Sequence, residues 1–295
     1  MASALEVRTG TGSPPAELRA DGDWITLRAR PDFPGRPRLG PLDLLRVNRR
    51  LAGGAKFALD PEDGEVVLAA DASIADRAAR PDGDRFGSAL DLRIGRARAG
   101  IEEAQAWAAG PSAFSPRSAG AAADASAAGL EDLAALCAAS GWPFEEREGG
   151  KLVVPLEAAG SGQPAEVARD ARGSVRVTVR LSDAAEAAEP CLEAAGVFLL
   201  LVSGALRFMR AALAEDEPGR SFILENRFDD PPTPAEMADA LTASSLALGM
   251  SSREMQALLE DESLARAYLA LRGSAFFRAS LAAREHGKEN PHADS

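Results

Sequence analysis

A run of thirteen uncharged residues, 194–206, constrains the fold more than any other part of the chain. It lies inside the apolar stretch 190–213, and Glu193 and Arg207 flank it. Because apolar residues occur all round the helical wheel, a helix made from this run must be buried on most sides. The run is shorter than the roughly 20 residues that a membrane-spanning helix needs. We therefore expect it to form the central helix of an α+β unit.

Composition limits the classes of protein to which the chain can belong. Of its 295 residues 46% are hydrophobic, which suits two domains with cores of Ala, Leu and Val. The net charge of −12 argues against nucleic acid or an anionic membrane as the main partner. The first residues have no apolar signal-peptide core, so we expect a cytoplasmic protein. Cys137 and Cys191 each stand alone and are expected to be buried thiols.

The first half, residues 1–110, predicts a β–α–β–β–α unit. Its clearest local signal is a hairpin in which Asp63 and Gly64 occupy the turn between two runs of β-forming residues. Residues 1–22 are polar and rich in Gly and Pro, and they are expected to be irregular. The expected elements are a strand at 24–30, a helix at 42–51, strands at 55–60 and 65–70, and a helix at 86–107 with Trp107 as an anchor.

The second half begins after residues 111–129, an Ala/Ser/Gly-rich segment that we interpret as a linker. Residues 130–285 predict α–β–β–β–α–β–α with extra C-terminal helices, and residues 286–295 are expected to be disordered. The expected helix starts are an Asp183 cap for the core helix and capping boxes at Thr233 and Ser251. The other expected elements are a helix at 130–140, a hairpin turning at Gly149 and Gly150, strands at 174–181 and 220–228, and helices at 234–248, 252–260 and 262–284.

Strands that follow one another without intervening helices indicate the α+β class. We expect two related units, each a meander sheet with helices. Their central helices would be 194–206 and the shorter, more polar 42–51. The second unit should hold the larger core, and the first should lean on it.

Residues 44–74 resemble the central block of the type III secretion chaperone-like fold, which the YbjN family shares. The resemblance rests on Leu44, Leu45 and Asn48 in a helix, the Gly53-Gly54 pair, and a hairpin of the form Phe-Ala-Leu-Asp with Gly64, Val67 and Leu68. A helix ending near Trp107 follows. It covers about a quarter of the chain. The second half fits more loosely, because one strand of its second hairpin is missing after Phe228.

The resemblance implies a tandem in which two related halves pack as the chaperone homodimers do. It also implies binding of other proteins, often as extended segments laid along a sheet or groove, without a cofactor. The two halves can pair within one chain as a pseudo-dimer, or the whole chain can form a homodimer, and both arrangements remain open.

Histidine is scarce, and its positions exclude several kinds of catalytic site. His286 and His292 are the only two, and both lie in the polar tail. A Ser-His-Asp or Cys-His site and a His/Cys zinc site are therefore not expected in the ordered part of the chain. No phosphate-binding glycine motif is present. We accordingly predict no enzyme, no catalytic residues, no metal and no cofactor.

The most suggestive charged feature is a basic segment at residues 28–50, with a net charge of +5 in an acidic protein. It can contact acidic groups of a partner through bidentate guanidinium–carboxylate pairs. The preferred interpretation is a solvated face, or a surface held against the acidic second half, because charge runs are usually solvated. The candidate partner-binding residues are Arg28, Arg30, Arg36, Arg38, Arg46, Arg49 and Arg50.

Three functions remain open from the sequence. The first is a non-catalytic, chaperone-like module that binds a protein or an extended peptide by strand addition or in an apolar groove. The second is a small-molecule-binding or enzymatic domain that uses Arg and Glu/Asp alone, which a pocket of convergent charged groups would favour. The third is a structural subunit whose apolar surface is used in self-association.

Overall fold

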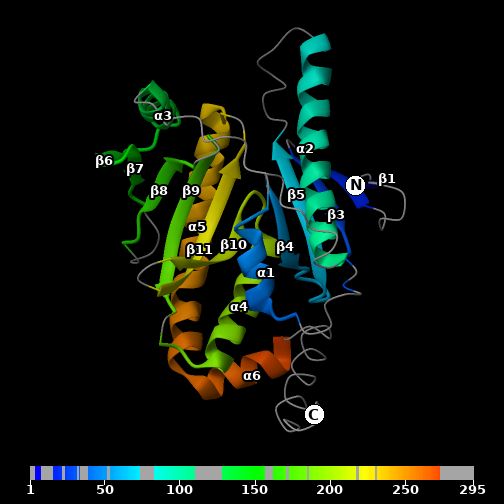
Figure 1. Ribbon diagram of the computed structural model, residues 1–295, viewed down its shortest axis with the longest axis vertical. Helices are drawn as coiled ribbons and strands as arrows, with labels where there is room; N and C mark the ends of the chain where they lie inside the picture. The colour runs from blue at the N-terminus through cyan, green and yellow to red at the C-terminus, as the bar shows by residue number, and fades with distance from the viewer. Residues whose placement is uncertain are drawn as a thin grey trace, which may run out of the picture.

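A computed structural model of the chain has an α+β fold, with two antiparallel sheets and helices packed against them (Figure 1). The fold class predicted from the order of elements is therefore confirmed. The structure describes residues 4–7, 16–21, 24–31, 33, 39–51, 54–73, 83–109, 128–156, 162–170, 173–184, 186–216, 219–229 and 231–272.

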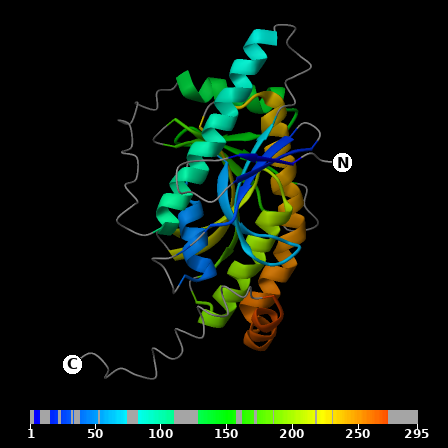
Figure 2. The same ribbon diagram turned by 90° about the vertical axis from the view of Figure 1, so that its right-hand side faces the viewer.

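The first unit contains a five-stranded sheet with the order β1-β2-β3-β5-β4. Helix α2 packs against β3, β4 and β5 (Figure 2), where Trp107 contacts the Phe57 ring edge-on at 5.4 Å between centroids. Its elements are β1 (Ala4–Val7), β2 (Ala16–Asp21), β3 (Trp24–Ala29), α1 (Pro41–Asn48), β4 (Ala55–Leu59), β5 (Val66–Ser73) and α2 (Gly83–Ala109).

The second unit contains a six-stranded sheet with the order β10-β11-β9-β8-β7-β6. Helix α5 packs against β9 and β11, and α6 follows α5 directly. Its elements are α3 (Ala128–Ala139), β6 (Glu145–Arg147), β7 (Lys151–Val154), β8 (Ala165–Arg169), β9 (Val175–Asp183), α4 (Glu189–Ala205), β10 (Arg210–Asp216), β11 (Gly219–Phe228), α5 (Pro234–Glu260) and α6 (Glu262–Arg272).

The two units have the same connectivity. In each, a three-stranded meander leads to a helix, a two-stranded hairpin and a second helix. The hairpin joins each sheet in the same order. Its second strand pairs with the last strand of the meander, and its first strand forms the edge of the sheet. Under this correspondence α1 matches α4, β4 matches β10, and α2 matches α5. The second unit adds β6 and α3 in front, and α6 behind.

Helix α4 has the buried position that its composition predicts. It lies in the middle of the molecule in Figure 1 and contacts α1, α5, α6, β4 and β10. Apolar side chains on several of its sides, such as Leu192, Ala194 and Val197, are buried. The main apolar cluster includes buried side chains from both units, among them Leu45, Phe57, Leu200 and Phe222. The two units therefore share a core.

Strands β1, β2, β8 and β10 were not expected from the sequence. Residues expected to be irregular form β1 and β2, which complete the first meander. The strand that the second hairpin seemed to lack is β10, which precedes β11 rather than following Phe228. Its first residues, 210–213, lie at the end of the apolar stretch 190–213, because the helix stops at Ala205 and the chain turns back through 206–209. Strand β8 was also not predicted.

Two predicted helix starts are wrong. Asp183 ends strand β9, and α4 begins at Glu189 with Ala188 as its N-cap. Helix α5 runs without interruption through Ser251, whose hydroxyl donates to the Ala247 carbonyl oxygen at 2.5 Å. A serine that bonds to the residue four positions back continues a helix and does not cap a new one.

Several local predictions are confirmed. The β4–β5 hairpin pairs Phe57 with Leu68, and Gly64 in its turn has a φ of 73°. Strands β6 and β7 pair around Gly149 and Gly150, which have φ values of 77° and 75°. Only glycine adopts this left-handed region without a steric cost. The segments proposed as a linker and a disordered tail lie, apart from residues 128 and 129, outside the described residues.

The capping box at Thr233 is confirmed in full. The Thr233 hydroxyl accepts from the Glu236 N–H at 3.2 Å, and the Glu236 carboxylate accepts from the Thr233 N–H at 2.9 Å. Thr233→Ala is expected to lower the free energy of unfolding by about 1 kcal/mol, because the first turn of α5 loses its acceptor. Urea denaturation measures this. Thr242→Ala, which removes an exposed mid-helix hydroxyl, is the control and should cost less. Equal losses would contradict the capping role.

Within the described part of the chain, no helix is both long enough and apolar enough to cross a membrane.

Candidate functional site at the junction of the two units

Each sheet has a face that carries polar side chains. This face points away from the long helix of its unit, which is α2 in the first unit and α5 in the second. In the first sheet this polar face carries Thr26, Arg28, Lys56 and Asp71, as the strand register shows. In the second sheet it carries Arg176, Arg210, Glu225 and Arg227. In each unit a short connection joins the central helix to the hairpin. The α4–β10 connection lies against the polar face of the first sheet, and the α1–β4 connection lies against that of the second. The junction is therefore built from the same contact made twice.

Lys56 and Arg210 are equivalent residues at the start of the two hairpins. Each precedes the strand residue whose N–H is bound by a side chain of the central helix, Asn48 for Phe57 and Ser203 for Ala211. Both cations are buried. Lys56 donates to the main-chain oxygens of two residues in the α4–β10 connection, Leu206 at 2.7 Å and Met209 at 2.9 Å. Arg210 donates to the Leu51 oxygen in the α1–β4 connection at 2.9 Å.

Asp71 neutralises Lys56 on the first polar face. Their charged atoms are 3.1 Å apart, and both side chains are only 3% exposed. The carboxylate also accepts from the Thr26 hydroxyl at 2.8 Å and from the Phe208 N–H at 2.9 Å. Burial alone would raise the pKa of Asp71, but Lys56 and these two donors outweigh burial and lower it. Asp71 is therefore ionised at neutral pH.

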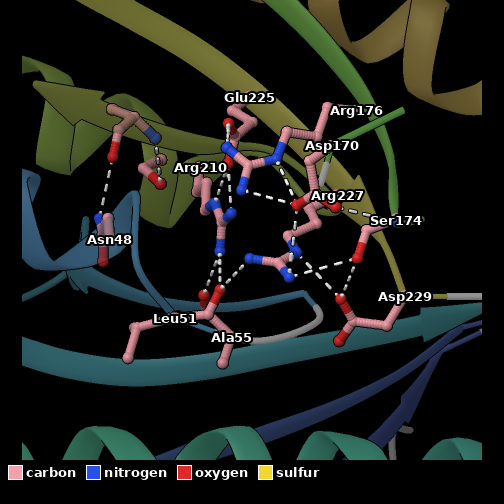
Figure 3. Close-up of polar contacts among 12 residues, drawn as sticks. Asn48, Leu51, Ala55, Asp170, Ser174, Arg176, Arg210, Glu225, Arg227 and Asp229 are labelled. Carbon is pink, nitrogen blue, oxygen red and sulfur yellow. Dashed lines mark hydrogen bonds and ion pairs between the residues drawn. The ribbon is translucent and has the colours of Figure 1, made fainter. Parts of the chain in front are cut away.

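On the second polar face lies an arginine network, formed by Arg176, Arg210 and Arg227 with Asp170, Glu225 and Asp229 (Figure 3). Glu225 accepts from Arg210 and, at 3.1 Å, from Arg176. Burial opposes its ionisation, but the surrounding arginines lower its pKa. Three cations face three anions, so the network is neutral as a whole. Its donors are directed at carboxylates and at the Leu51 oxygen, which is the arrangement of a structural network.

Asn48 connects the inner edges of the two sheets. Its side chain is fully buried, accepts from the Phe57 N–H at 2.6 Å and donates to the Phe57 oxygen at 2.9 Å. It also donates to the Ala211 oxygen of β10 at 2.9 Å. An edge strand exposes unpaired main-chain groups that attract other chains. At β4 and β10, the main-chain groups of Phe57 and Ala211 are satisfied within the molecule.

The central helices approach each other and the opposite sheet closely at two glycines of α4. A β-carbon on Gly196 would lie 3.1 Å from the Pro41 β-carbon of α1. A β-carbon on Gly204 would lie 1.9 Å from the Leu59 main-chain oxygen of β4. The second separation is far below van der Waals contact, so this approach requires glycine.

The buried carboxylates make the stability of the junction depend on pH. Asp71 and Glu225 have lowered pKa values in the folded state, so they bind fewer protons than in the unfolded chain. Their stabilising contribution is complete above their unfolded pKa values and is lost as the pH falls through the lowered ones. We expect the free energy of unfolding to fall between about pH 5 and pH 2. Urea denaturation measures this, and Glu225→Gln should show a shallower fall. If the free energy of unfolding fell with pH as steeply in Glu225→Gln as in the unchanged chain, Glu225 would not be a source of the pH dependence.

A basic cleft opens beside the Lys56–Asp71 pair, with a volume of about 260 Å³. Its floor is the polar face of the first sheet, and its rim is the end of α4 with the connection that follows. Phe208 in this connection has a φ of 67° and packs edge-on against Trp24, with 5.0 Å between centroids. The lining residues are Arg19, Thr26, Arg28, Lys56, Ala69, Asp71, Gly204, Ala205, Leu206 and Arg207.

The residues of the predicted basic segment do not gather at one place. Arg28 lies in the cleft and is 3.6 Å from Asp60. Arg30 is exposed and contacts Asp63 at 2.5 Å. Arg46 contacts Asp43 and, across the junction, Glu215 of the second unit, both at 3.0 Å. Arg49 is half-buried, and Arg50 is exposed. Arg36 and Arg38 lie outside the described residues.

Sequence reasoning missed the other charged residues of the junction. Arg19 lies in a strand that was not predicted, and Arg207 appeared only as the end of an apolar run. Arg210 lies in a strand that was not predicted, Glu225 and Arg227 flank Asn226 in β11, and no motif joins them. The one available signal was alternation in β9, which placed Arg176 and Arg180 on the face opposite the valines.

Among the described residues, no group of three His, Cys, Asp or Glu side chains is placed to hold a metal ion. No protein-family model matches the chain. The curated proteins contain no significant match to it either.

Proposed function

We propose that the protein is a non-catalytic, chaperone-like module that binds another protein or an extended peptide. The observation that carries this proposal is the reciprocal packing of two units with one connectivity. The resemblance of residues 44–74 to type III secretion chaperone-like folds implies such a tandem, with halves packed as the chaperone homodimers are. Asn48, one of the residues behind the resemblance, contacts both sheet edges at the junction.

The environments of the charged groups favour binding over catalysis. The buried cations Lys56 and Arg210 each contact a carboxylate and main-chain oxygens of the other unit, so their donors serve the packing. Burial raises the pKa of the Cys137 thiol to about 11, so this thiol is protonated and weakly nucleophilic at neutral pH. The cleft is also smaller than the roughly 300–1,000 Å³ of sites for small molecules and cofactors.

The proposal is tested by native co-purification of the tagged full-length chain from its host, with identification of bound proteins by mass spectrometry. We expect a reproducible protein that, once purified, rebinds to the chain in a fixed ratio. Gly204→Ala is the test variant, because its altered junction is expected to reduce capture of the partner. A monomer that carries only a small ligand, or that repeatedly captures nothing which rebinds, would overturn the proposal.

A further inference from the structure

We propose that the apolar surface of α4 and α5 that α6 covers is a binding site for an amphipathic helix of the partner protein, which displaces α6. This inference rests on the proposed function and assigns the site and the partner's chemistry within it. It follows from the place of α6 in the fold, from the residues with which α6 fills the surface, and from the way in which α6 is held.

Helix α6 is an addition to the connectivity that the two units share. It has no counterpart among the described elements of the first unit, and it follows the long helix α5. A single residue, Asp261, separates the two helices, and its backbone is extended with a φ of −118° and a ψ of 101°. The chain therefore bends at this residue, and α6 lies across the ends of α4 and α5 (Figure 1).

The surface beneath α6 is apolar, with small side chains at its centre. Cys191 and Ala194 of α4 are buried in one cluster with Leu258 of α5 and Ala265 of α6, and Phe198 packs against this cluster. Positions 191, 194 and 198 lie on one side of α4, because residues three and four apart are neighbours on a helix. Side chains in such a row form the grooves into which a second helix packs.

Helix α6 fills this surface with one small residue and two larger ones. Ala265 is fully buried, and Tyr268 and Leu269 are half-buried against the cluster. The Tyr268 ring meets the Phe198 ring edge-on, with 6.3 Å between centroids. Anchors at one position and at three and four positions beyond it are the mode in which an amphipathic helix binds a groove. The seated helix thus shows the chemistry that the surface accepts.

The molecule holds α6 by few contacts. Of the eleven residues of α6, only Ala265 is buried, and Leu264 and Leu271 are 43% and 80% exposed. The ion pair of Arg266 with Glu262 lies within α6 and does not connect it to α4 or α5. Segments with few buried apolar side chains open locally at a low cost in free energy. Helix α6 can therefore leave its site while the rest of the second unit stays folded.

A partner helix has to compete with α6 for this surface. Because α6 is tethered beside its own site, its effective concentration there is on the order of millimolar. A change that releases α6 should therefore raise the apparent affinity for a partner helix. Ala265→Glu is such a change, since a carboxylate buried in an apolar cluster without a partner is strongly unfavourable. Ala267→Glu adds the same charge at an exposed position of α6 and is the matched control.

The experiment measures binding of a labelled synthetic peptide of residues 262–272 to the intact full-length chain by fluorescence anisotropy. This peptide represents the partner helix, because its sequence fits the surface. It should bind Ala265→Glu at least about tenfold more tightly than it binds the unchanged chain, whose own α6 competes. Ala267→Glu should behave as the unchanged chain does. A second peptide, which itself carries Ala265→Glu, should bind to none of the three proteins.

Hydrogen exchange measures the release of α6 in the unchanged chain, without any substitution. The amide protons of α6 should exchange at least about tenfold faster than those of α4, because α6 opens without unfolding of the unit. If α6 exchanged as slowly as α4, it would open only together with the whole unit, and the inference would fail.

Equal binding of the peptide to the three proteins, or no binding to Ala265→Glu, would overturn the inference. Dimers of the unchanged chain that are lost in Ala265→Glu would overturn it as well, since a second copy would then exchange α6 and occupy the surface. In co-purification, Ala265→Glu should capture more of the partner than the unchanged chain does. If both capture the same amount, the proposed function survives and the assignment of the surface fails. If neither captures a partner, the proposed function itself fails.

Discussion

Gly204→Ala is expected to lower the free energy of unfolding by about 3 kcal/mol, because the new methyl group would lie 1.9 Å from the Leu59 oxygen. The atom it meets belongs to the main chain of β4, which is paired with β5 and cannot rotate aside as a side chain can. Helix α4 and β4 must therefore separate, and with them the two units. Chemical denaturation monitored by circular dichroism measures the loss.

Gly95→Ala in α2 is the matched control for this substitution. Gly95 is also inside a helix, is exposed, and has no atom within 4 Å of the added β-carbon. Since alanine favours the helix, this variant should be more stable than the unchanged chain by about 0.5–1 kcal/mol. If Gly204→Ala stabilised the protein in the same way, the close approach of α4 and β4 would be wrong.

Glu225→Gln is expected to destabilise the protein by about 3–5 kcal/mol, because it removes a buried charge and leaves Arg210 without its carboxylate. Arg176 loses a contact in the same step. The neighbouring anions Asp170 and Asp229 cannot replace the lost charge without leaving Arg227. The arginine network should therefore behave as a unit. Urea denaturation at neutral pH measures the change.

A double-mutant cycle separates this pair from a surface contact. Arg210→Gln combined with Glu225→Gln should cost less than the sum of the two single variants, because no uncompensated charge remains. The same cycle on the exposed pair Arg266–Glu262 should give a coupling of only about 0.3–0.5 kcal/mol. Equal coupling in the two cycles would mean that the network is no more than a solvated surface contact.

Elements with strong local signals were predictable from the sequence. The β4–β5 hairpin has its turn residues, α4 has its apolar composition, and Thr233 has the full capping box. Strand β10 was not predictable, because residues such as Ala211, Ala212 and Leu213 also favour helices. Its state is set by pairing with β11 and by contacts with α1. When tertiary contacts decide the state of a segment, local propensity carries little information about it.

The candidate site was less predictable than the fold, since its residues come together only through tertiary structure. The sequence grouped Arg28 with Arg30 and Arg46, which are close in the chain. The structure instead brings Arg28 together with Arg19 of β2 and with Arg207, far along the sequence. Charge density along the chain therefore identified one of these three arginines. Arg19 required recognition of strand β2, and Arg207 required knowledge of which loop of one unit covers which sheet of the other.

Joining two equivalent units in one chain frees them from having equal sequences. In a symmetric dimer, any change on one polar face is imposed on both. Here the positions of Thr26 and Arg19 on the first face correspond to Arg176 and Ala168 on the second, as the two strand registers show. One face carries an ion-pair network that holds the halves together, while its counterpart carries a cleft. Two units of the same connectivity within one chain can thus give equivalent surfaces different roles.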